Sequence, residues 1–310
     1  MRTIISFILA GAALGLLLSA CGDSGDDSGA AVHVTATTPQ VADFVREVGG
    51  DRVAVDQILS PSSDPHEYEP RPSDAATLAD ADLVVSSGGD LDSWLGQVVD
   101  ASGTDATELT LIDHVETRTV DGETDPHWWL DPRNTELAVG AIADALAEAD
   151  PDGAAGYRRR ADAYLKELRD LDSSIAACMS AIPAPERKLV TSHDALGYYA
   201  DRYGIEVIGA AIPSLSTQGQ ASAGETADLV DTIKRTGVST VFPEEGTSAK
   251  LERAIADEAG AKVGGELWTD TLGPDGSDGA TYVEAMRSNT AKLADGFTDG
   301  RDDCAEALGG

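Results

Sequence analysis

The sequence predicts an α/β protein in which two lobes, each built on a mostly parallel sheet, are joined by one long helix. Three observations support this prediction. Apolar, β-branched runs alternate with segments of helical spacing, as expected for parallel sheets wrapped by helices. A helical segment at residues 154–179 is longer than an ordinary domain helix and interrupts that alternation. The chain length suits two domains of ordinary size.

The first lobe is expected at residues 32–150. Its strands are the apolar and β-branched runs, and Gly49 and Gly50 end the first helix. The expected strands are 32–38, 53–59, 83–86 and 110–112, and the expected helical segments are 41–48, one ending at 77–81, 90–99 and 134–149.

The long connecting helix is expected within residues 151–182, because Pro151 precedes it and the Pro-Ala-Pro sequence at 183–185 stops it. Residues 183–310 then repeat the alternation as the second lobe. Its expected strands are 188–191, 207–211, 240–242 and 261–267, and its expected helices are 196–203, 224–236, 248–258 and 282–297.

The N-terminus has the features of an export signal. Arg2 precedes an apolar run at 4–18 that is too short for a stable membrane span, and small residues follow it. The Leu-Ser-Ala-Cys sequence resembles the bacterial lipobox, so residues 1–20 are predicted to be a lipoprotein signal peptide and Cys21 the lipidated first residue. The alternative is an ordinary signal peptide with an incidental cysteine. Residues 21–31 are expected to form a flexible tether that keeps the protein near the outer face of the membrane.

The charge of the chain is strongly acidic. It has 22 basic and 55 acidic residues and a formal net charge of −33. Nucleic-acid binding is therefore excluded, because neutralising phosphates requires a basic face. Most of the acidic residues are expected to form a solvated surface, and cations are attracted to such a surface. We expect the chain to act as a monomer.

Two of only five histidines, His66 and His127, lie in the same Asp-Pro-His sequence. His193 follows a predicted strand, and Asp270 lies in a Trp-Thr-Asp sequence late in the second lobe. Three imidazoles and one carboxylate form a complete set of ligands for a cation such as zinc. Since ligands in open α/β sheets bind beyond the carboxyl ends of strands, and two of these residues fall in each lobe, the site is expected in the interlobe cleft.

Other polar and aromatic residues have supporting or structural roles in this interpretation. A ligating histidine needs an outer hydrogen-bond partner. The candidates are Asp64, Glu67, Asp125, Asp131 and Asp194, while Glu244 and Glu245 are expected at most in that outer layer. His33 is interpreted as structural and His114 as a loop residue with at most a weak accessory contact. Trp128 and Trp129 either exclude water from the site or belong to the core, and Tyr198 and Tyr199 are interpreted as packing residues.

Two cysteines remain, Cys178 at the end of the long helix and Cys304 near the C-terminus. An extracytoplasmic setting permits a disulfide between them that would hold the tail, and a pair of inert buried thiols is the alternative.

The chain resembles the zinc- and manganese-binding solute receptors of bacterial ABC importers, the TroA/ZnuA-like group. The matching stretches are residues 64–70, 125–132, 191–198 and 268–273. The resemblance implies two α/β lobes on one rigid helix, and metal ligation by His66, His127, His193 and Asp270. It also implies a non-enzymatic receptor, anchored by lipid outside the cell membrane, that delivers a divalent metal ion to a membrane permease. The assignments of His193 and Asp270 depend mainly on this resemblance.

Two departures from the family bear on the metal. The segment at 113–124 is short and holds only His114, whereas many zinc receptors of the group carry a long His-rich loop there. Manganese receptors of the group often have Glu at the third ligand position, where this chain has His193. Three imidazoles favour Zn²⁺ over the harder Mn²⁺, which is the alternative.

Functions of other classes are the alternatives. A zinc-dependent hydrolase needs an open coordination position, and the His-Glu-x-x-His helix motif is absent. An adhesin or a metallochaperone would use the same metal ligands.

Overall fold

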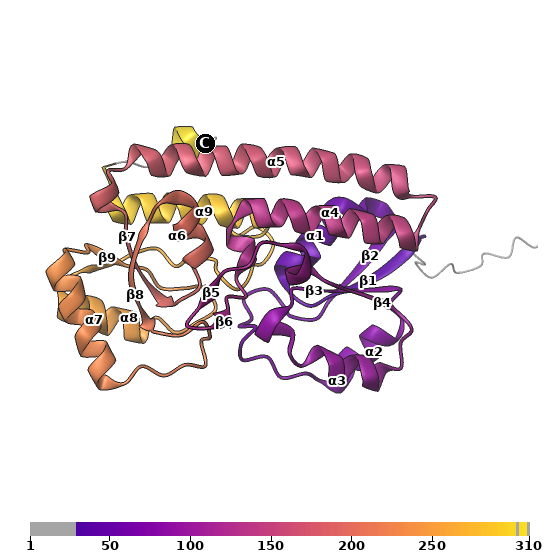
Figure 1. Cartoon of the computed structure of the whole chain (residues 1–310), viewed down its shortest axis with the longest axis horizontal. Helices are drawn as coiled ribbons and strands as arrows, with labels where there is room; N and C mark the ends of the chain where they lie inside the picture. The colour runs from indigo at the N-terminus through magenta and orange to yellow at the C-terminus, as the bar shows by residue number, and fades with distance from the viewer. Residues whose placement is uncertain (1–28, 302–303, 309–310) are drawn as a thin grey trace, which may run out of the picture.

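The structure is a computed structural model that describes residues 29–301 and 304–308. The predicted signal peptide, Cys21 and most of the predicted tether lie outside the described residues. Two α/β lobes lie side by side beneath one long helix, α5 (Ala154–Ala181), which runs along the top of both (Figure 1). The α/β fold predicted from the sequence is confirmed.

The first lobe contains a four-stranded, fully parallel sheet in the order β2-β1-β3-β4. The strands are β1 (Val32–Ala36), β2 (Val53–Gln57), β3 (Leu83–Ser86) and β4 (Thr107–Thr110). The helices are α1 (Pro39–Gly49), α2 (Pro72–Ala79), α3 (Leu95–Ser102) and α4 (Pro132–Ala149). The prediction of a strand at 110–112 is wrong in position. Strand β4 ends at Thr110, opposite the end of β3, and the fully buried Leu111 begins a short 3₁₀ helix, η3 (Leu111–His114), instead.

The second lobe has parallel strands in the order β8-β7-β9-β10, if two isolated bridges are included. The strands are β7 (Lys188–His193), β8 (Glu206–Ile212), β9 (Thr240–Val241) and β10 (Lys262–Val263). The helices are α6 (Gly197–Tyr203), α7 (Ala223–Thr236), α8 (Lys250–Ala259), α9 (Tyr282–Thr298) and the short α10 (Ala305–Leu308). The strand expected at 261–267 is shorter than predicted. Gly264 lies so close to Phe242 that a Cβ atom would be 2.6 Å from its ring, and the chain rejoins the sheet only at Leu267.

A short antiparallel hairpin, β5 (Thr119–Val120) and β6 (Glu123–Thr124), lies between the two lobes beside β8 (Figure 1). From the sequence, this segment is expected only as a short loop. The hairpin belongs to the first half of the chain but touches the second lobe, because the main-chain N–H of Arg118 donates to the hydroxyl of Tyr198 in α6 over 2.9 Å.

One apolar core extends through both lobes and the long helix. It includes Val34 of the first sheet, Trp128 between the lobes, Leu168 of α5 and Phe242 of the second lobe, each 1% exposed or less. Helix α5 packs against α1 and α4 of the first lobe and α9 of the second. Because close-packed interiors resist deformation, this shared core limits how far the lobes can move apart.

Cys178 of α5 is joined to Cys304 by a disulfide, which holds the chain before α10 against the long helix. Leu308 of α10 is buried in the shared core. Among the helices of the described ranges, none combines the length and the apolar character needed to cross a bilayer.

Candidate metal centre

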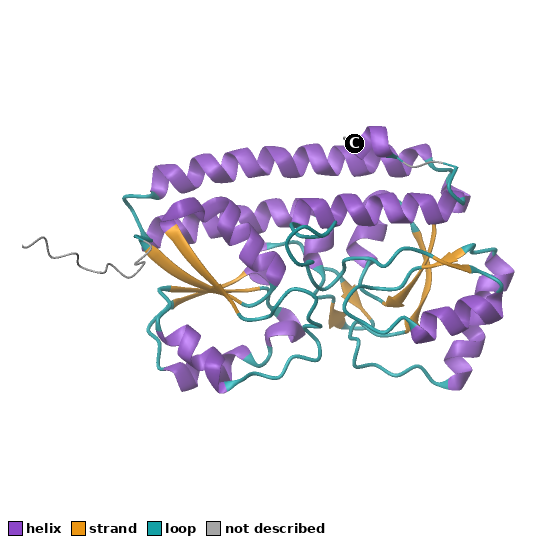
Figure 2. Ribbon diagram, turned by 180° about the vertical axis from the view of Figure 1, so that it is seen from behind, coloured by secondary structure: helices purple, strands orange, loops and turns teal. Residues whose placement is uncertain are grey.

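Four side chains from distant parts of the chain meet in one group. Loops of both lobes converge in the middle of the molecule (Figure 2). His66 lies between β2 and α2, His127 precedes the 3₁₀ helix η4 (Trp128–Leu130), His193 ends β7, and Asp270 lies between β10 and α9. One nitrogen or oxygen atom from each lies within 4.8 Å of the atoms from the others. The structure therefore brings together all four residues that the sequence analysis selected as ligands.

The donor atoms form a compact group. The Nε2 atom of His127 lies 3.4 Å from Nε2 of His66 and 3.3 Å from Nε2 of His193. Asp270 places Oδ1 3.3 Å from Nε2 of His127, and Oδ2 3.2 Å from Nε2 of His193 and 3.4 Å from Nε2 of His66. Within the described residues, the buried Oδ1 atom of Asp270 accepts no hydrogen bond. Such an orphaned acceptor facing three imidazole nitrogens is suited to a bound cation.

Two of the imidazoles are oriented from behind by buried carboxylates. Asp125 Oδ1 lies 2.7 Å from Nδ1 of His127 and accepts the main-chain N–H of the same residue over 3.0 Å. Glu244 holds His193 in the same way, with Oε2 2.7 Å from Nδ1 and Oε1 3.0 Å from the main-chain nitrogen. A carboxylate at Nδ1 keeps the proton there and leaves the Nε2 lone pair free for a metal.

The charges of the centre are strongly coupled. Burial alone would raise the pKa of Asp270, but the imidazoles of His193 and His127 hold it well below its usual value. Burial alone would lower the pKa of His193, but the carboxylates of Glu244 and Asp270 raise it well above its usual value. In the metal-free protein, a proton on His193 therefore offsets part of the negative charge, and a bound metal ion would have to displace it.

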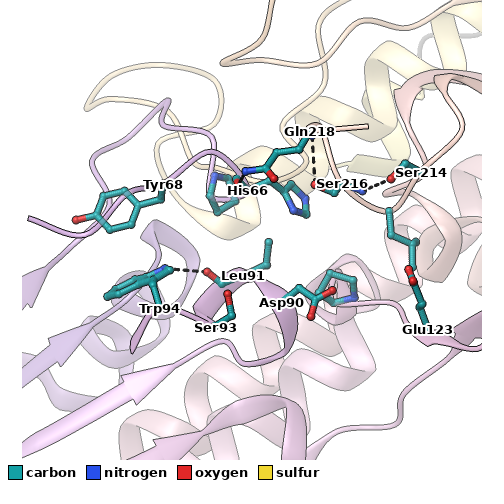
Figure 3. A pocket seen from close by; sticks show the side chains of 13 residues that line it. His66, Tyr68, Asp90, Leu91, Ser93, Trp94, Glu123, Ser214, Ser216 and Gln218 are labelled. Carbon is teal, nitrogen blue, oxygen red and sulfur yellow. Dashed lines mark hydrogen bonds between the residues drawn. The ribbon is translucent and has the colours of Figure 1, made fainter. Parts of the chain in front are cut away.

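His66 is the ligand candidate that borders a cavity next to the centre. It lines a cavity of about 340 Å³, with Tyr68 and Trp94 at one end (Figure 3). Its main-chain N–H donates to Oδ1 of Asp64 over 2.9 Å, and its main-chain carbonyl accepts from the side chain of Gln218 in the second lobe. The cavity therefore adjoins the centre at His66.

The other residues selected from the sequence have different outcomes. Asp125 and Glu244 are the outer partners of two histidines, whereas Asp64 bonds only the main chain of His66 and Asp131 caps the N-terminus of α4. No hydrogen bond from a histidine ring to Glu67, Asp194 or Glu245 is present in the described part.

The remaining aromatic and histidine candidates are also placed. Trp129 borders the centre, because its ring lies edge-on to His127 and its Nε1 donates to the main-chain carbonyl of Thr269 over 2.9 Å. Trp128 is a core residue that packs on Phe44, and His33 and His114 lie outside the group of four.

Two contributors near the centre were missed by sequence reasoning. Arg118 donates to the second oxygen of Asp125 over 2.7 Å, and the hydroxyl of Tyr198 donates to the main-chain carbonyl of Asp125 over 2.9 Å. From the sequence, Tyr198 is expected to be a packing residue; in the structure its hydroxyl also makes hydrogen bonds to the main chain of Asp125 and Arg118. No pattern in the sequence around Arg118 predicts its contact with Asp125, because the turn of the β5–β6 hairpin brings the two residues together.

The fold and the converging donors define a two-lobed, metal-binding class of protein. Residues 34–296 match the family described as ZnuA, zinc-uptake complex component A, periplasmic, and the chain belongs to this family. It is 32% identical to the manganese-binding lipoprotein MntA of Halalkalibacterium halodurans, over 92% of this chain and 96% of that protein. It is 28% identical to the iron-binding protein YfeA of Yersinia pestis, over 87% of this chain and 88% of that protein.

Among solved structures, the periplasmic zinc-binding protein TroA of Treponema pallidum superposes with a TM-score of 0.80 at 27% identity, covering 86% of this chain and 99% of that one. The chain is thus a metal-binding, substrate-binding protein of the ABC-transporter type and not an enzyme, as the sequence analysis expected. The named relatives differ in their metal.

Proposed function

We propose that this protein is an extracytoplasmic lipoprotein that captures a divalent metal ion with His66, His127, His193 and Asp270 and delivers it to an ABC import permease. The observation that carries the proposal is the convergence of three imidazole Nε2 atoms and an orphaned carboxylate oxygen. A metal-dependent hydrolase is disfavoured, since four protein ligands leave little room for a reactive water.

Zinc is the proposed ion. Ligand distances of about 2.0–2.1 Å give a tetrahedral zinc site edges of about 3.3–3.4 Å between neighbouring donor atoms. The Nε2–Nε2 separations of 3.3 and 3.4 Å at His127 agree with such edges. The separations of 3.2 and 3.4 Å from Oδ2 of Asp270 to His193 and His66 agree as well. Three nitrogen ligands also suit a borderline-soft cation better than a hard one.

Manganese is the second candidate. Several relatives are named as manganese-binding or manganese-transporter lipoproteins, among them MntA, ScaA and PsaA. Both oxygens of Asp270 face imidazoles, so the carboxylate can supply two donor atoms and raise the coordination number above four. A higher coordination number with more oxygen suits Mn²⁺.

The lipid anchor is proposed from the lipobox at Cys21 and from relatives that are named as lipoproteins. Mass analysis of the N-terminal peptide from the membrane fraction tests it. A diacylglycerol-modified Cys21 supports the anchor, and an unmodified mature chain in the soluble fraction contradicts it.

Competition between metals tests the function itself. The mature chain, stripped of metal, is titrated with Zn²⁺ and with Mn²⁺ against a chelator of known affinity. We expect one ion per chain and tighter binding of zinc. Tighter binding of manganese would replace the zinc assignment, and failure to bind either ion stoichiometrically would refute the receptor proposal.

A further inference from the structure

The hairpin segment that leads into His127 is tied to the second lobe through Arg118. The Nη1 atom of Arg118 donates to Oδ2 of Asp125 over 2.7 Å, and its Nε atom lies 3.2 Å from Oδ2 of Asp201 in α6. Asp125 is fully buried, and its other oxygen, Oδ1, holds both the ring and the main chain of His127. Arg118 therefore binds the carboxylate oxygen that His127 does not use.

The main chain around this contact is held as well. Tyr198 in α6 accepts the N–H of Arg118 and donates to the carbonyl of Asp125, each over 2.9 Å. The N–H of Asp125 donates to the carbonyl of Arg118 over 3.0 Å. These bonds hold the main chain of Arg118 and of Asp125 at fixed positions relative to α6.

Gly197, the first residue of α6, provides the space through which Arg118 passes. A Cβ atom there would lie 1.6 Å from Nη1 and 2.4 Å from Cζ of Arg118. The backbone of Gly197 is not in the left-handed region that favours glycine, so the missing side chain is what matters at this position. Any side chain at 197 would have to push the flexible end of Arg118 away from Asp125.

We propose that Arg118 is a positioning residue of the metal centre: Arg118 orients Asp125, and Asp125 in turn orients His127. Gly197 makes this possible, because its missing side chain leaves the space that Arg118 occupies. The inference rests on the proposed function, because its main readout is metal affinity. Outer hydrogen-bond partners of metal ligands commonly change affinity about 10–100-fold when removed, and Arg118 acts one contact further out.

Charge repulsion alone predicts the opposite change in metal affinity when Arg118 is removed, so the inference can be tested. A guanidinium near the centre repels a cation, so its removal should strengthen metal binding if charge alone mattered. The positioning role predicts weaker binding, because a buried carboxylate without its ion-pair partner no longer holds the imidazole in one orientation.

The test is a zinc titration of the metal-free mature chain against a competing chelator. Arg118→Met and Gly197→Ala should each weaken zinc binding by about tenfold, and Arg118→Lys, which keeps the charge, should recover part of the loss. Gly197→Ala displaces the guanidinium without changing the net charge. Arg133→Met is the matched control: Arg133 is an exposed residue 3.9 Å from its nearest carboxylate, and its removal changes the net charge equally and should not weaken binding.

Two further readouts separate positioning from general damage. In an Asp125→Asn background, Arg118→Met should have little additional effect on zinc affinity. Nitrogen-15 NMR of the metal-free chain should show that Gly197→Ala disturbs the protonated Nδ1 of His127, a measurement that does not depend on zinc binding. Unchanged or tighter zinc binding in Arg118→Met and Gly197→Ala, full additivity with Asp125→Asn, or an unchanged His127 signal would each overturn the inference. Failure of the unaltered chain to bind zinc would instead refute the proposed zinc function.

Discussion

At the scale of single residues, the centre uses carboxylates in two different ways. Asp270 faces the three imidazoles directly, whereas Asp125 and Glu244 contact two of them at Nδ1 from the other side. The first arrangement suits a carboxylate that serves as a proposed ligand, and the second suits one that fixes the tautomer of a proposed histidine ligand. The position of each carboxylate relative to the ring therefore decides its role.

Replacing His66 by Ala removes one of the four proposed ligands. We expect zinc affinity to fall by more than about 100-fold, since loss of a direct ligand exceeds the effect of losing an outer partner. The metal-free fold should remain, because His66 lies in a loop. Isothermal titration calorimetry measures the change, with His33→Ala as the control on the exposed side of β1. Equal zinc affinity in His66→Ala and the unaltered chain would show that His66 is not a ligand.

Replacing Glu244 by Gln keeps the shape of the side chain but removes the charge behind His193. We expect zinc affinity to fall about 10–100-fold, because the imidazole becomes a weaker donor and its orientation is less fixed. Glu245→Gln is the matched control, since it makes the same charge change without a bond to a histidine ring in the described part. If both variants lose affinity equally, the effect is one of net charge and not of the Glu244–His193 contact.

At the scale of elements, the sequence predicts long periodic segments well and short pairings badly. Helix α5 and strand β3 lie at the expected positions, because their apolar periodicity is local. The strand expected at 261–267 is shorter in the structure, where β10 covers Lys262–Val263 and the chain pairs again only at Leu267. The β5–β6 hairpin was missed, since two-residue strands carry almost no periodic signal.

The disulfide between Cys178 and Cys304 joins two residues that are 126 positions apart in the sequence. A cross-link over such a long loop restricts the unfolded chain, so its loss is expected to cost about 2–5 kcal/mol of stability. We expect Cys178→Ser to lower the melting temperature of the metal-free chain, as measured by calorimetry. Zinc affinity should not change, because neither cysteine contributes to the metal centre. Two free thiols in the natively purified protein would contradict the bridge.

At the scale of the whole molecule, one core joins both lobes to the long helix. The loop that carries Asp270 is also bonded across the cleft, because Thr269 accepts from Trp129 and the main-chain N–H of Ser62 donates to the main-chain carbonyl of Leu272 over 3.0 Å. Because the shared core and these hydrogen bonds hold the two lobes together, metal binding should order the centre with only small displacements. It should also stabilise the folded state.

Metal binding should also be linked to protons. The raised pKa of His193 means that its proton stabilises the metal-free fold below the unfolded value of about 6.5. That contribution is lost as pH rises through the higher folded-state pKa. Zinc must displace this proton, so zinc affinity should rise with pH across the neutral range. Calorimetry in buffers of different ionisation enthalpy should show proton release on binding, and buffer-independent enthalpies would contradict the linkage.

The sequence by itself determined the α/β alternation, the long helix, the acidic charge and the ligand types, because each depends on neighbouring residues or on composition. It also marked His66 and His127 through a repeated local context. The selection of Asp270 depended mainly on the family resemblance and not on a local pattern. Only the tertiary structure decided that Glu244 contacts His193 and that Arg118 contacts Asp125. The Glu244–His193 contact joins residues 51 positions apart, so it depends on how the chain folds back on itself. The Arg118–Asp125 contact spans only 7 positions, but it depends on the β5–β6 turn, which has almost no periodic signal in the sequence.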